Sequence, residues 1–168
     1  YINQFINLNQ IFERENPKIL EIGFGMGTAT AQIAQKLPEK DFLAIDVHGP
    51  GVGNLCKLIS EQQLTNVRVM RHDAVEVVEN MLSDNSLDGI HIFFPDPWHK
   101  KRHNKRRLIQ ILFIEKLLPK LKQGGYIHLA TDWEEYAVQM LEVLSSFPEQ
   151  LANTATDYAP TPNYRPET

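Results

Sequence analysis

The segment FFPDPWHKKRHNKRR, residues 93–107, places an acidic side chain between two prolines, next to a tryptophan and a dense block of cations. Each proline fixes its own φ angle and restrains the residue before it, so Asp96 is held on both sides. A carboxylate mounted in this way can read a nucleic-acid base, and the neighbouring cations can bind phosphates. The simpler interpretation is a proline-rich turn in which Asp96 caps the following helix.

Charge is distributed unevenly along the chain. The 168 residues carry a formal net charge of −4, from 17 Lys and Arg against 21 Asp and Glu. A basic patch on an acidic body suits the local capture of a polyanion, so phosphate binding is favoured over an ordinary solvated helix start. Six of the cations lie within eight residues: Lys100, Lys101, Arg102, Lys105, Arg106 and Arg107.

The composition is that of a globular protein, with 42% hydrophobic and 23% charged residues. No apolar run approaches the roughly 20 residues that cross a bilayer, so we expect no membrane segment and no signal peptide. The single cysteine, Cys56, cannot form an internal disulfide, which fits a reducing cytoplasm. Because the chain begins without Met and ends abruptly, we expect it to be a fragment.

Apolar runs rich in Ile, Leu, Val and Phe alternate with amphipathic stretches, which predicts an α/β fold with a parallel sheet and helices on both faces. Such sheets bind ligands at the carboxyl ends of the strands, where the strand order reverses. We expect one domain over residues 1–168, with a helix within 1–16 and an irregular tail at 153–168. The expected strands are 18–23, 41–46, 66–71, 87–94 and 125–131, and the expected helices are 27–37, 51–63, 74–82, 106–118 and 133–147.

A glycine-rich turn follows the first expected strand. The sequence LEIGFGMGTAT, residues 20–30, leaves the strand through Gly23, Gly25 and Gly27 and then enters a helix. Glycines permit a tight turn and a close approach of the backbone to a ligand, although such turns serve several nucleotide-type cofactors and sometimes only a corner. The G-x-G-x-G spacing differs from the G-x-G-x-x-G spacing that is typical of dinucleotide sites.

Acidic residues lie at the ends of the first three expected strands. Asp46 ends the second strand, where a carboxylate can accept hydrogen bonds from ribose hydroxyls. Glu21 lies inside the glycine turn, a position that opposes a pyrophosphate and suits a cationic or zwitterionic ligand. Asp73 follows the third strand and either caps the next helix or lies beside an adenine, with Ala74 as a backbone donor. This set of acids favours S-adenosylmethionine over a nicotinamide dinucleotide.

Four further residues have open alternatives. Trp98 either covers the core or shapes a pocket. His99 and His103 are four residues apart, as in a metal-binding pair on a helix, but no third ligand is evident and their neighbours are cationic, so we expect no metal site. Asp132 precedes a helix with acids in its first turn; it caps that helix or faces the same cleft as Asp96, and the two roles can coexist.

Together these segments resemble the bacterial tRNA (guanine-N7)-methyltransferases. LEIGFGMG, DVHGPGVG, HDAVEV, FFPDPWHKKRHNKRR and ATDWEEYA are similar to that family's segments, in the same order and at matching separations. The resemblance covers nearly the whole chain, and its most specific piece is the proline-flanked aspartate with the cations after it. It implies a Rossmann-like class I methyltransferase fold. It also implies methyl transfer from S-adenosylmethionine to N7 of guanine 46 in tRNA, by a cytoplasmic monomer or weak homodimer that releases S-adenosylhomocysteine.

The resemblance also assigns roles to individual residues. Asp96 lines the cofactor pocket and lies closest to catalysis. Asp46 stands where the family commonly has glutamate, so its carboxylate is expected to reach the ribose less directly. The family's R-P-x-T element continues into a stretch that completes the guanosine site, whereas here it stops at Thr168. The other implied cofactor contacts are Glu21, Gly23, Gly25, Asp46, Asp73 and Ala74. The expected tRNA contacts are Lys100, Asp132, Thr168, Lys105, Arg106 and Arg107.

Three other functions share these features. Another S-adenosylmethionine-dependent RNA methyltransferase would use the same pocket, because the residues alone do not select guanine N7. A nicotinamide-dependent oxidoreductase would need a pyrophosphate beside the glycine turn, which Glu21 opposes. A non-catalytic RNA-binding module with a vestigial pocket is opposed by the intact acids at every strand end.

Overall fold

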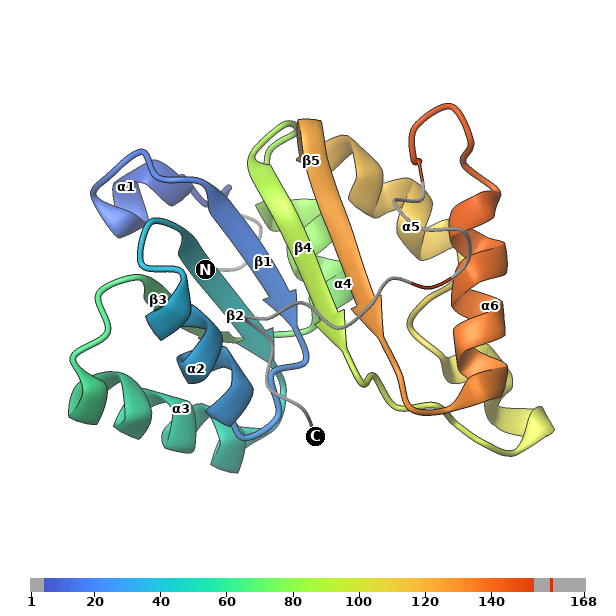
Figure 1. Ribbon diagram of the computed structural model, residues 1–168, viewed down its shortest axis with the longest axis horizontal. Coiled ribbons are helices and arrows are strands. Elements are labelled where there is room, and N and C mark those ends of the chain that lie inside the picture. Colours follow the sequence, from blue (N-terminus) through green and yellow to red (C-terminus); the bar gives the residue numbers. More distant parts are fainter. Residues whose placement is uncertain (1–4, 153–157, 159–168) are drawn as a thin grey trace.

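The computed structural model describes residues 5–152 and Tyr158, and strands alternate with helices along the chain (Figure 1). Within the described residues, no helix is both long and apolar enough to cross a membrane. The strands are β1 (Lys18–Ile22), β2 (Asp41–Asp46), β3 (Val67–Arg71), β4 (Leu87–Phe93) and β5 (Leu121–Ala130). The α-helices are α1 (Leu8–Phe12), α2 (Thr28–Lys36), α3 (Gly49–Gln62), α4 (Ala74–Glu76), α5 (Ile111–Leu117) and α6 (Glu134–Ser145).

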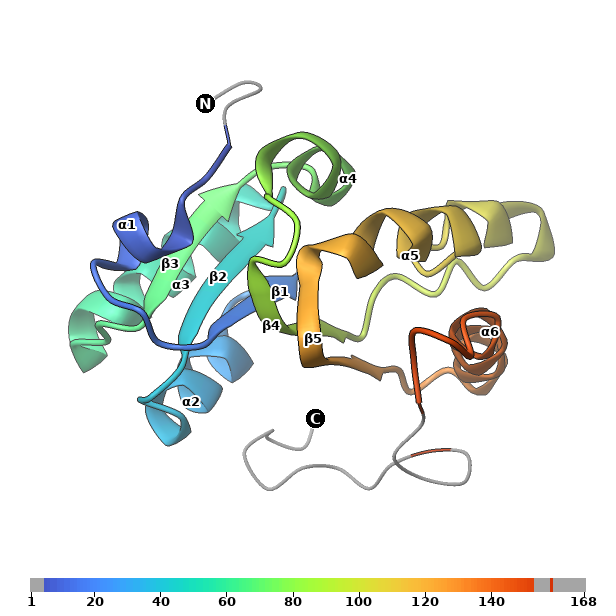
Figure 2. The ribbon, with the colours of Figure 1, turned by 90° about the horizontal axis from the view of Figure 1, so that it is seen from above.

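The strands form one sheet with the order β3-β2-β1-β4-β5, and every pairing is parallel. This confirms the expected parallel α/β architecture. Alternate residues of a strand point to opposite faces, so β1 sends Leu20 into the larger core, with α5 and α6, and Ile19 into a second core against α2. Figure 2 shows α4 and α5 on one side of the sheet and α2 on the other.

Three segments differ from the expectation. Of the N-terminal helix expected at residues 1–16, the described part, which starts at Phe5, forms only α1. Glu13 takes a left-handed conformation (φ 58°) that ends this helix. Strand β5 begins at Leu121, four residues earlier than expected. The helix expected at 106–118 begins only at Ile111, and the cationic residues form a separate 3₁₀ helix, Lys101–Arg106. Like charges one turn apart destabilise an α-helix, which favours this separation.

Candidate active site

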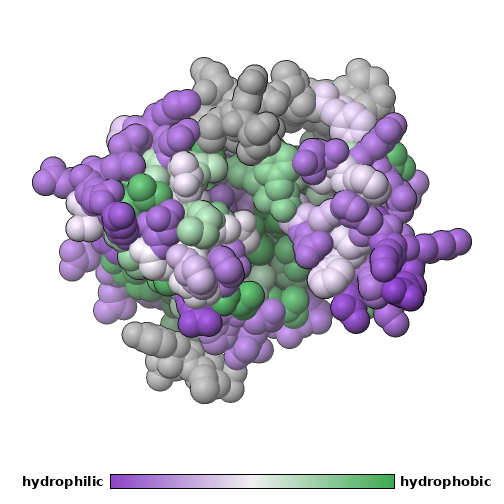
Figure 3. All heavy atoms as spheres, turned by 90° about the horizontal axis from the view of Figure 1, so that it is seen from below, coloured by the Kyte–Doolittle hydropathy of each residue, from purple (hydrophilic) through white to green (hydrophobic). Residues whose placement is uncertain are grey.

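The acids singled out in the sequence lie along one edge of the sheet. All five strands run in the same direction, so their carboxyl ends meet at that edge, and the strand order reverses between β1 and β4. Figure 3 looks onto this edge and shows a hollow with a hydrophobic floor between two hydrophilic lobes. In the order of the strands that they end or follow, the acids are Asp73, Asp46, Glu21, Asp96 and Asp132.

The glycine turn links β1 to α2 at the centre of this edge. Gly25 has φ 61°, a left-handed conformation that favours glycine, and its backbone N–H donates to Oδ2 of Asp46 at 2.9 Å. The N–H of Gly23 donates to the carbonyl of Ile45 at 2.8 Å. A Cβ added at Gly23 or Gly25 would meet no atom within 4 Å, so this side of the turn is open to a ligand.

Helix α3 holds the other side of the turn through a backbone contact that the sequence analysis missed. A Cβ at Gly51 would lie only 1.8 Å from the carbonyl oxygen of Gly25, so no residue with a side chain fits there without a shift. Asn54 adds a hydrogen bond from its side-chain amide to the carbonyl of Met26, at 2.6 Å. The signal in the sequence is the run GPGVG at residues 49–53, which has more glycine than the start of a helix requires.

Asp46 anchors the turn with its carboxylate. Besides Gly25, it accepts hydrogen bonds from the backbone N–H groups of Val47 at 2.7 Å and His48 at 3.3 Å, both to Oδ1. A carboxylate has about four lone-pair sites, so about one is left for a ligand hydroxyl. The expectation that this short side chain reaches a ribose less directly than a glutamate would stays a prediction.

Glu21 lies beneath the turn and is buried, with 4% of its surface exposed. Its Oε1 accepts a hydrogen bond from the hydroxyl of Thr30 on α2, at 2.5 Å. Burial raises the pKa of Glu21 to about 7; the Thr30 hydrogen bond opposes this shift and the nearby Asp46 carboxylate adds to it. A buried carboxylate with this pKa is a suitable partner for a cationic ligand, because a positive charge would stabilise its ionised form.

Asp73 is the N-cap of α4, and its Oδ2 accepts a hydrogen bond from the backbone N–H of Glu76 at 3.1 Å. The capping interpretation is therefore confirmed. Asp73 is exposed, and Ala74, the first residue of α4, is half-buried. Both residues follow the end of β3. Their contact with an adenine stays a prediction.

The loop after β4 carries Asp96 on a strained backbone. Phe94 (φ 51°) and Trp98 (φ 45°) are both left-handed, an uncommon conformation for bulky residues that tends to occur at functional sites. Oδ1 of Asp96 accepts from the N–H of Trp98 at 3.2 Å, so Asp96 stabilises its own turn and does not cap the next helix, whose N-cap is Lys100. Asp96 is exposed.

Arg107 corrects the expectation of a surface phosphate ligand. Only 3% of it is exposed. Its Nε–H donates to the carbonyl of Pro97 at 2.6 Å, and Nη1 donates to Oε1 of Gln139 at 2.5 Å. Nη2 lies 3.3 Å from Oε1 of Glu135, and the guanidinium stacks over Tyr136 at 4.9 Å. These contacts tie the Asp96 loop to α6, and they leave Arg107 unable to bind a phosphate without breaking them.

The other five cations of the segment are exposed. Arg106 lies over the ring of Trp98, with 5.1 Å between its Cζ atom and the ring centroid, and His103 meets the same ring edge-on. Trp98 is half-buried and therefore links the Asp96 loop to the cations. These cations, Lys100, Lys101, Arg102, Lys105 and Arg106, form what we call the basic rim of the cleft.

Asp132 is exposed and follows β5. The N-cap of α6 is Trp133, which makes no side-chain capping bond, and the Trp133 N–H donates to the hydroxyl of Thr131 at 3.2 Å. The capping role considered for Asp132 is therefore wrong, and the cleft-facing role stays a prediction. Thr168 lies outside the described residues.

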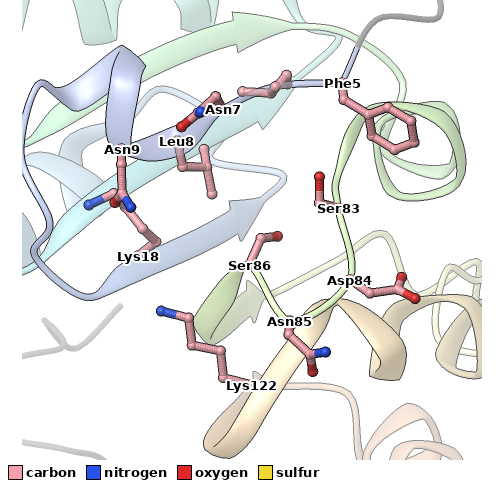
Figure 4. Close-up of a pocket in the computed structure, with 11 residues that line it drawn as sticks. Phe5, Asn7, Leu8, Asn9, Lys18, Ser83, Asp84, Asn85, Ser86 and Lys122 are labelled. Atoms are coloured by element: carbon pink, nitrogen blue, oxygen red, sulfur yellow. The ribbon is translucent and has the colours of Figure 1, made fainter.

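A separate hollow of about 450 Å³ lies at the opposite end of the sheet, between α1 and the start of β4 (Figure 4). The charges that line it already have partners: Lys18 pairs with Asp41, and Lys122 pairs with Asp88. This hollow therefore offers few unpaired charges to a charged ligand, in contrast to the cleft at the carboxyl edge of the sheet. In the part of the chain that is described, no group of three or more His, Cys, Asp or Glu could hold a metal ion.

Comparisons with known proteins show which sequences this chain resembles. Residues 15–168 match the model of a family described as "Putative methyltransferase". A tRNA (guanine-N(7)-)-methyltransferase from Neisseria meningitidis serogroup C (strain 053442) is 80% identical over 163 residues, which are 97% of this chain and 68% of that protein. One from Chromobacterium violaceum is 67% identical over 168 residues, which are 100% of this chain and 74% of that protein.

Solved structures show the fold. The precorrin-6y C5,15-methyltransferase from Geobacter metallireducens GS-15 has a TM-score of 0.61 at 16% identity, over 78% of this chain and 63% of that one. A SAM-dependent methyltransferase from Aquifex aeolicus has a TM-score of 0.52 at 21% identity, over 73% and 60%. These likenesses confirm the expected Rossmann-like methyltransferase fold.

The raised pKa of Glu21 predicts a dependence of stability on pH. Its folded-state pKa of about 7 lies above the ordinary value of 4.5, so the folded state binds this proton more tightly than the unfolded state. The stabilisation is complete below pH 4.5 and is lost as the pH rises through about 7, a change on the order of 3 kcal/mol. Urea unfolding between pH 4.5 and 8 measures it. Glu21→Gln should lose this decline, the exposed control Glu39→Gln should keep it, and equal slopes for Glu21→Gln and wild type would contradict the prediction.

Proposed function

Because the chain belongs to the tRNA (guanine-N(7)-)-methyltransferase family, we propose that it transfers a methyl group from S-adenosylmethionine to N7 of guanine 46, in the variable loop of tRNA. The observation that carries this proposal is the row of acids along the carboxyl edge of the sheet, with a basic rim at one end. An anionic cleft suits a sulfonium donor, and a cationic rim suits RNA phosphates. The proposed setting is the cytoplasm.

The residues of the cleft fit S-adenosylmethionine. The open side of the glycine turn allows a close approach of its backbone to the ligand. Glu21, half ionised near neutral pH, would be fully ionised beside the positively charged amino group or sulfonium of the donor. Asp46 has about one lone-pair site left for a ribose hydroxyl. The proposed cofactor contacts are Glu21, Gly23, Gly25, Asp46, Asp73, Ala74 and Asp96.

The proposed chemistry needs orientation more than proton transfer. Guanine N7 carries a lone pair and no proton, so it can attack without a general base, and bound S-adenosylmethionine supplies an electrophilic methyl group on sulfur. The N7–carbon bond forms as the carbon–sulfur bond breaks, and positive charge moves into the purine. Holding the nucleophile in line with the methyl group can contribute roughly 7–11 kcal/mol in favourable systems.

Asp96 is the residue proposed to stabilise the developing charge. A carboxylate that accepts hydrogen bonds from the N1 and N2 protons of the guanine becomes a better partner as the ring turns cationic. Its restrained loop, held by Arg107 through the Pro97 carbonyl, keeps that carboxylate at a fixed place on the edge. Asp132, at the neighbouring strand end, would assist it. Lys100, Lys105, Arg106 and Thr168 are the other proposed tRNA contacts.

Labelled methyl transfer tests the function. The full-length protein is incubated with labelled S-adenosylmethionine and an unmodified tRNA transcript, and the label is mapped by nuclease digestion. We expect 7-methylguanosine at position 46 and no label in a transcript with adenine there. Label on another RNA atom would indicate a different RNA methyltransferase, and RNA binding without label would indicate a non-catalytic module.

Asp96→Asn is expected to keep the side chain's shape and remove its charge. Turnover should fall by about 100-fold or more, because the lost interaction acts on charge that develops during the reaction, whereas the affinity for S-adenosylhomocysteine should change by less than about threefold. Single-turnover kinetics and calorimetry measure the two quantities. Turnover within about threefold of wild type would exclude the electrostatic role of Asp96.

The double variant Lys105→Gln, Arg106→Gln is expected to weaken tRNA binding and to flatten its dependence on salt. Each lost phosphate contact lowers the slope of log K against log salt by nearly one unit, so the double variant should lose roughly one to two units. Filter binding at several salt concentrations measures the slope.

Two controls separate the basic rim from other cations. Lys57→Gln removes an exposed cation on α3 and should leave the slope unchanged. Arg107→Met should lower the melting temperature, because it removes buried contacts, and should leave most of the slope intact. If Arg107→Met alone flattened the slope with no loss of stability, Arg107 would be a phosphate ligand after all.

A further inference from the structure

The rings of His99 and Trp133 stack parallel to each other, in the loops that follow β4 and β5. Their centroids are 4.0 Å apart and their planes differ by 2°. His99 lies three residues after Asp96, and Trp133 directly follows Asp132. The stack therefore joins the two loops whose carboxylates are proposed to meet the guanine.

The two partners of this stack differ in how firmly they are held. Trp133 is half-buried and packs against the main hydrophobic core, which holds its indole in place. His99 is exposed and lies in a stretch, residues 95–99, without regular secondary structure. One face of the Trp133 indole is therefore covered by the His99 ring, which can move away more easily than the indole can.

The indole N–H of Trp133 is a second unusual feature. Nε1 is buried, and it has no hydrogen-bond partner among the described residues. Buried donors are nearly always paired, and an unpaired one is costly. The edge of the indole therefore carries a buried donor that none of the described residues accepts.

We propose that Trp133 is the surface on which the target purine stacks, and that His99 occupies the place of this base until the RNA displaces it. Proteins that act on one base of a folded RNA take it out of its own stack and hold it on an aromatic side chain. An indole matches the area of a bicyclic purine, which the smaller imidazole covers only in part. The proposal rests on the proposed function.

The indole also favours the transition state over the bound substrate. As the methyl group moves to N7, the purine becomes cationic, and a cation over the face of tryptophan is attracted by the ring quadrupole, more strongly than over phenylalanine. The stacking interaction therefore strengthens during the reaction, which raises kcat as well as binding. A purely structural tryptophan would show no such dependence on the electronic character of the ring.

Three variants of the full-length protein test the proposal, with methyl transfer to tRNA as the assay. Trp133→Leu should lower kcat/KM for tRNA about 5- to 100-fold, the range expected from one base–aromatic stack, and should lower kcat. Trp133→Phe should fall between Leu and wild type in both constants. His99→Ala should lower KM, by about two- to fivefold, because it removes the competing ring. The exposed α6 control Val138→Ala should match wild type.

A fluorescence measurement gives a readout independent of turnover. In a Trp98→Phe background of this 168-residue chain, Trp133 is the only tryptophan. Stacking of a base quenches its emission. A tRNA with guanine at the target position should quench more than the same tRNA with an abasic site there. Equal quenching by the two RNAs would overturn the proposal.

The kinetic outcomes separate the two proposals. If wild type methylates tRNA and both Trp133 variants keep its constants, the stacking surface is wrong and the proposed function stands. If His99→Ala raises KM as Trp133→Leu does, the stack is a structural support. Should Trp133→Leu fail to fold, Trp133→Phe and the exposed His99→Ala still decide. A wild-type protein with no methyl transfer would overturn both proposals.

Discussion

The contact between the glycine turn and helix α3 is the constraint on which the cleft depends. The carbonyl oxygen of Gly25 lies only 1.8 Å from the position of a Cβ at residue 51, and the N–H of Gly25 donates to Asp46. Two contacts therefore constrain the peptide units around Gly25. One is the hydrogen bond to the carboxylate at the end of β2, and the other is the close packing of α3, which the absence of a side chain at Gly51 allows. The remaining side of the turn, which faces no protein atom within 4 Å, is the side left for a ligand.

Opposite charges are kept apart along the same edge. The buried Glu21 lies beneath the turn at β1, and the basic rim lies beyond the loop that follows β4. Arg107 lies next to the rim in sequence but does not belong to it, because its buried guanidinium binds the Asp96 loop and α6 at once. The proposed reaction uses this separation. The cationic donor must bind at the acids and the RNA phosphates at the basic rim, although the two ligands meet at the reacting atoms.

The sequence predicted the sheet and the row of acids because both follow from local pattern. Parallel strands bring their carboxyl ends to one edge, so an acid at each strand end must join the row. Arg107 was wrongly predicted to lie on the surface because its burial depends on two acceptors that the sequence pattern does not show. One is the backbone carbonyl of Pro97, and the other is the side chain of Gln139, which is distant in sequence. The capping role of Asp132 was wrong because α6 begins one residue later than expected, with Trp133 at its N-cap. Gly51 was missed because the reason for a glycine there is its close contact with the carbonyl of Gly25, in the turn after β1.

The most direct measurement of the central constraint is calorimetric titration of S-adenosylhomocysteine into two alanine variants of α3. A Cβ at Gly53 meets no atom within 4 Å, whereas one at Gly51 collides with the turn. Both substitutions favour the helix equally. With circular dichroism confirming that both variants are folded, Gly53→Ala should bind as wild type does and Gly51→Ala should bind at least about tenfold more weakly, a loss of roughly 1.4 kcal/mol. Wild-type affinity in Gly51→Ala would show that the turn does not form the cofactor site.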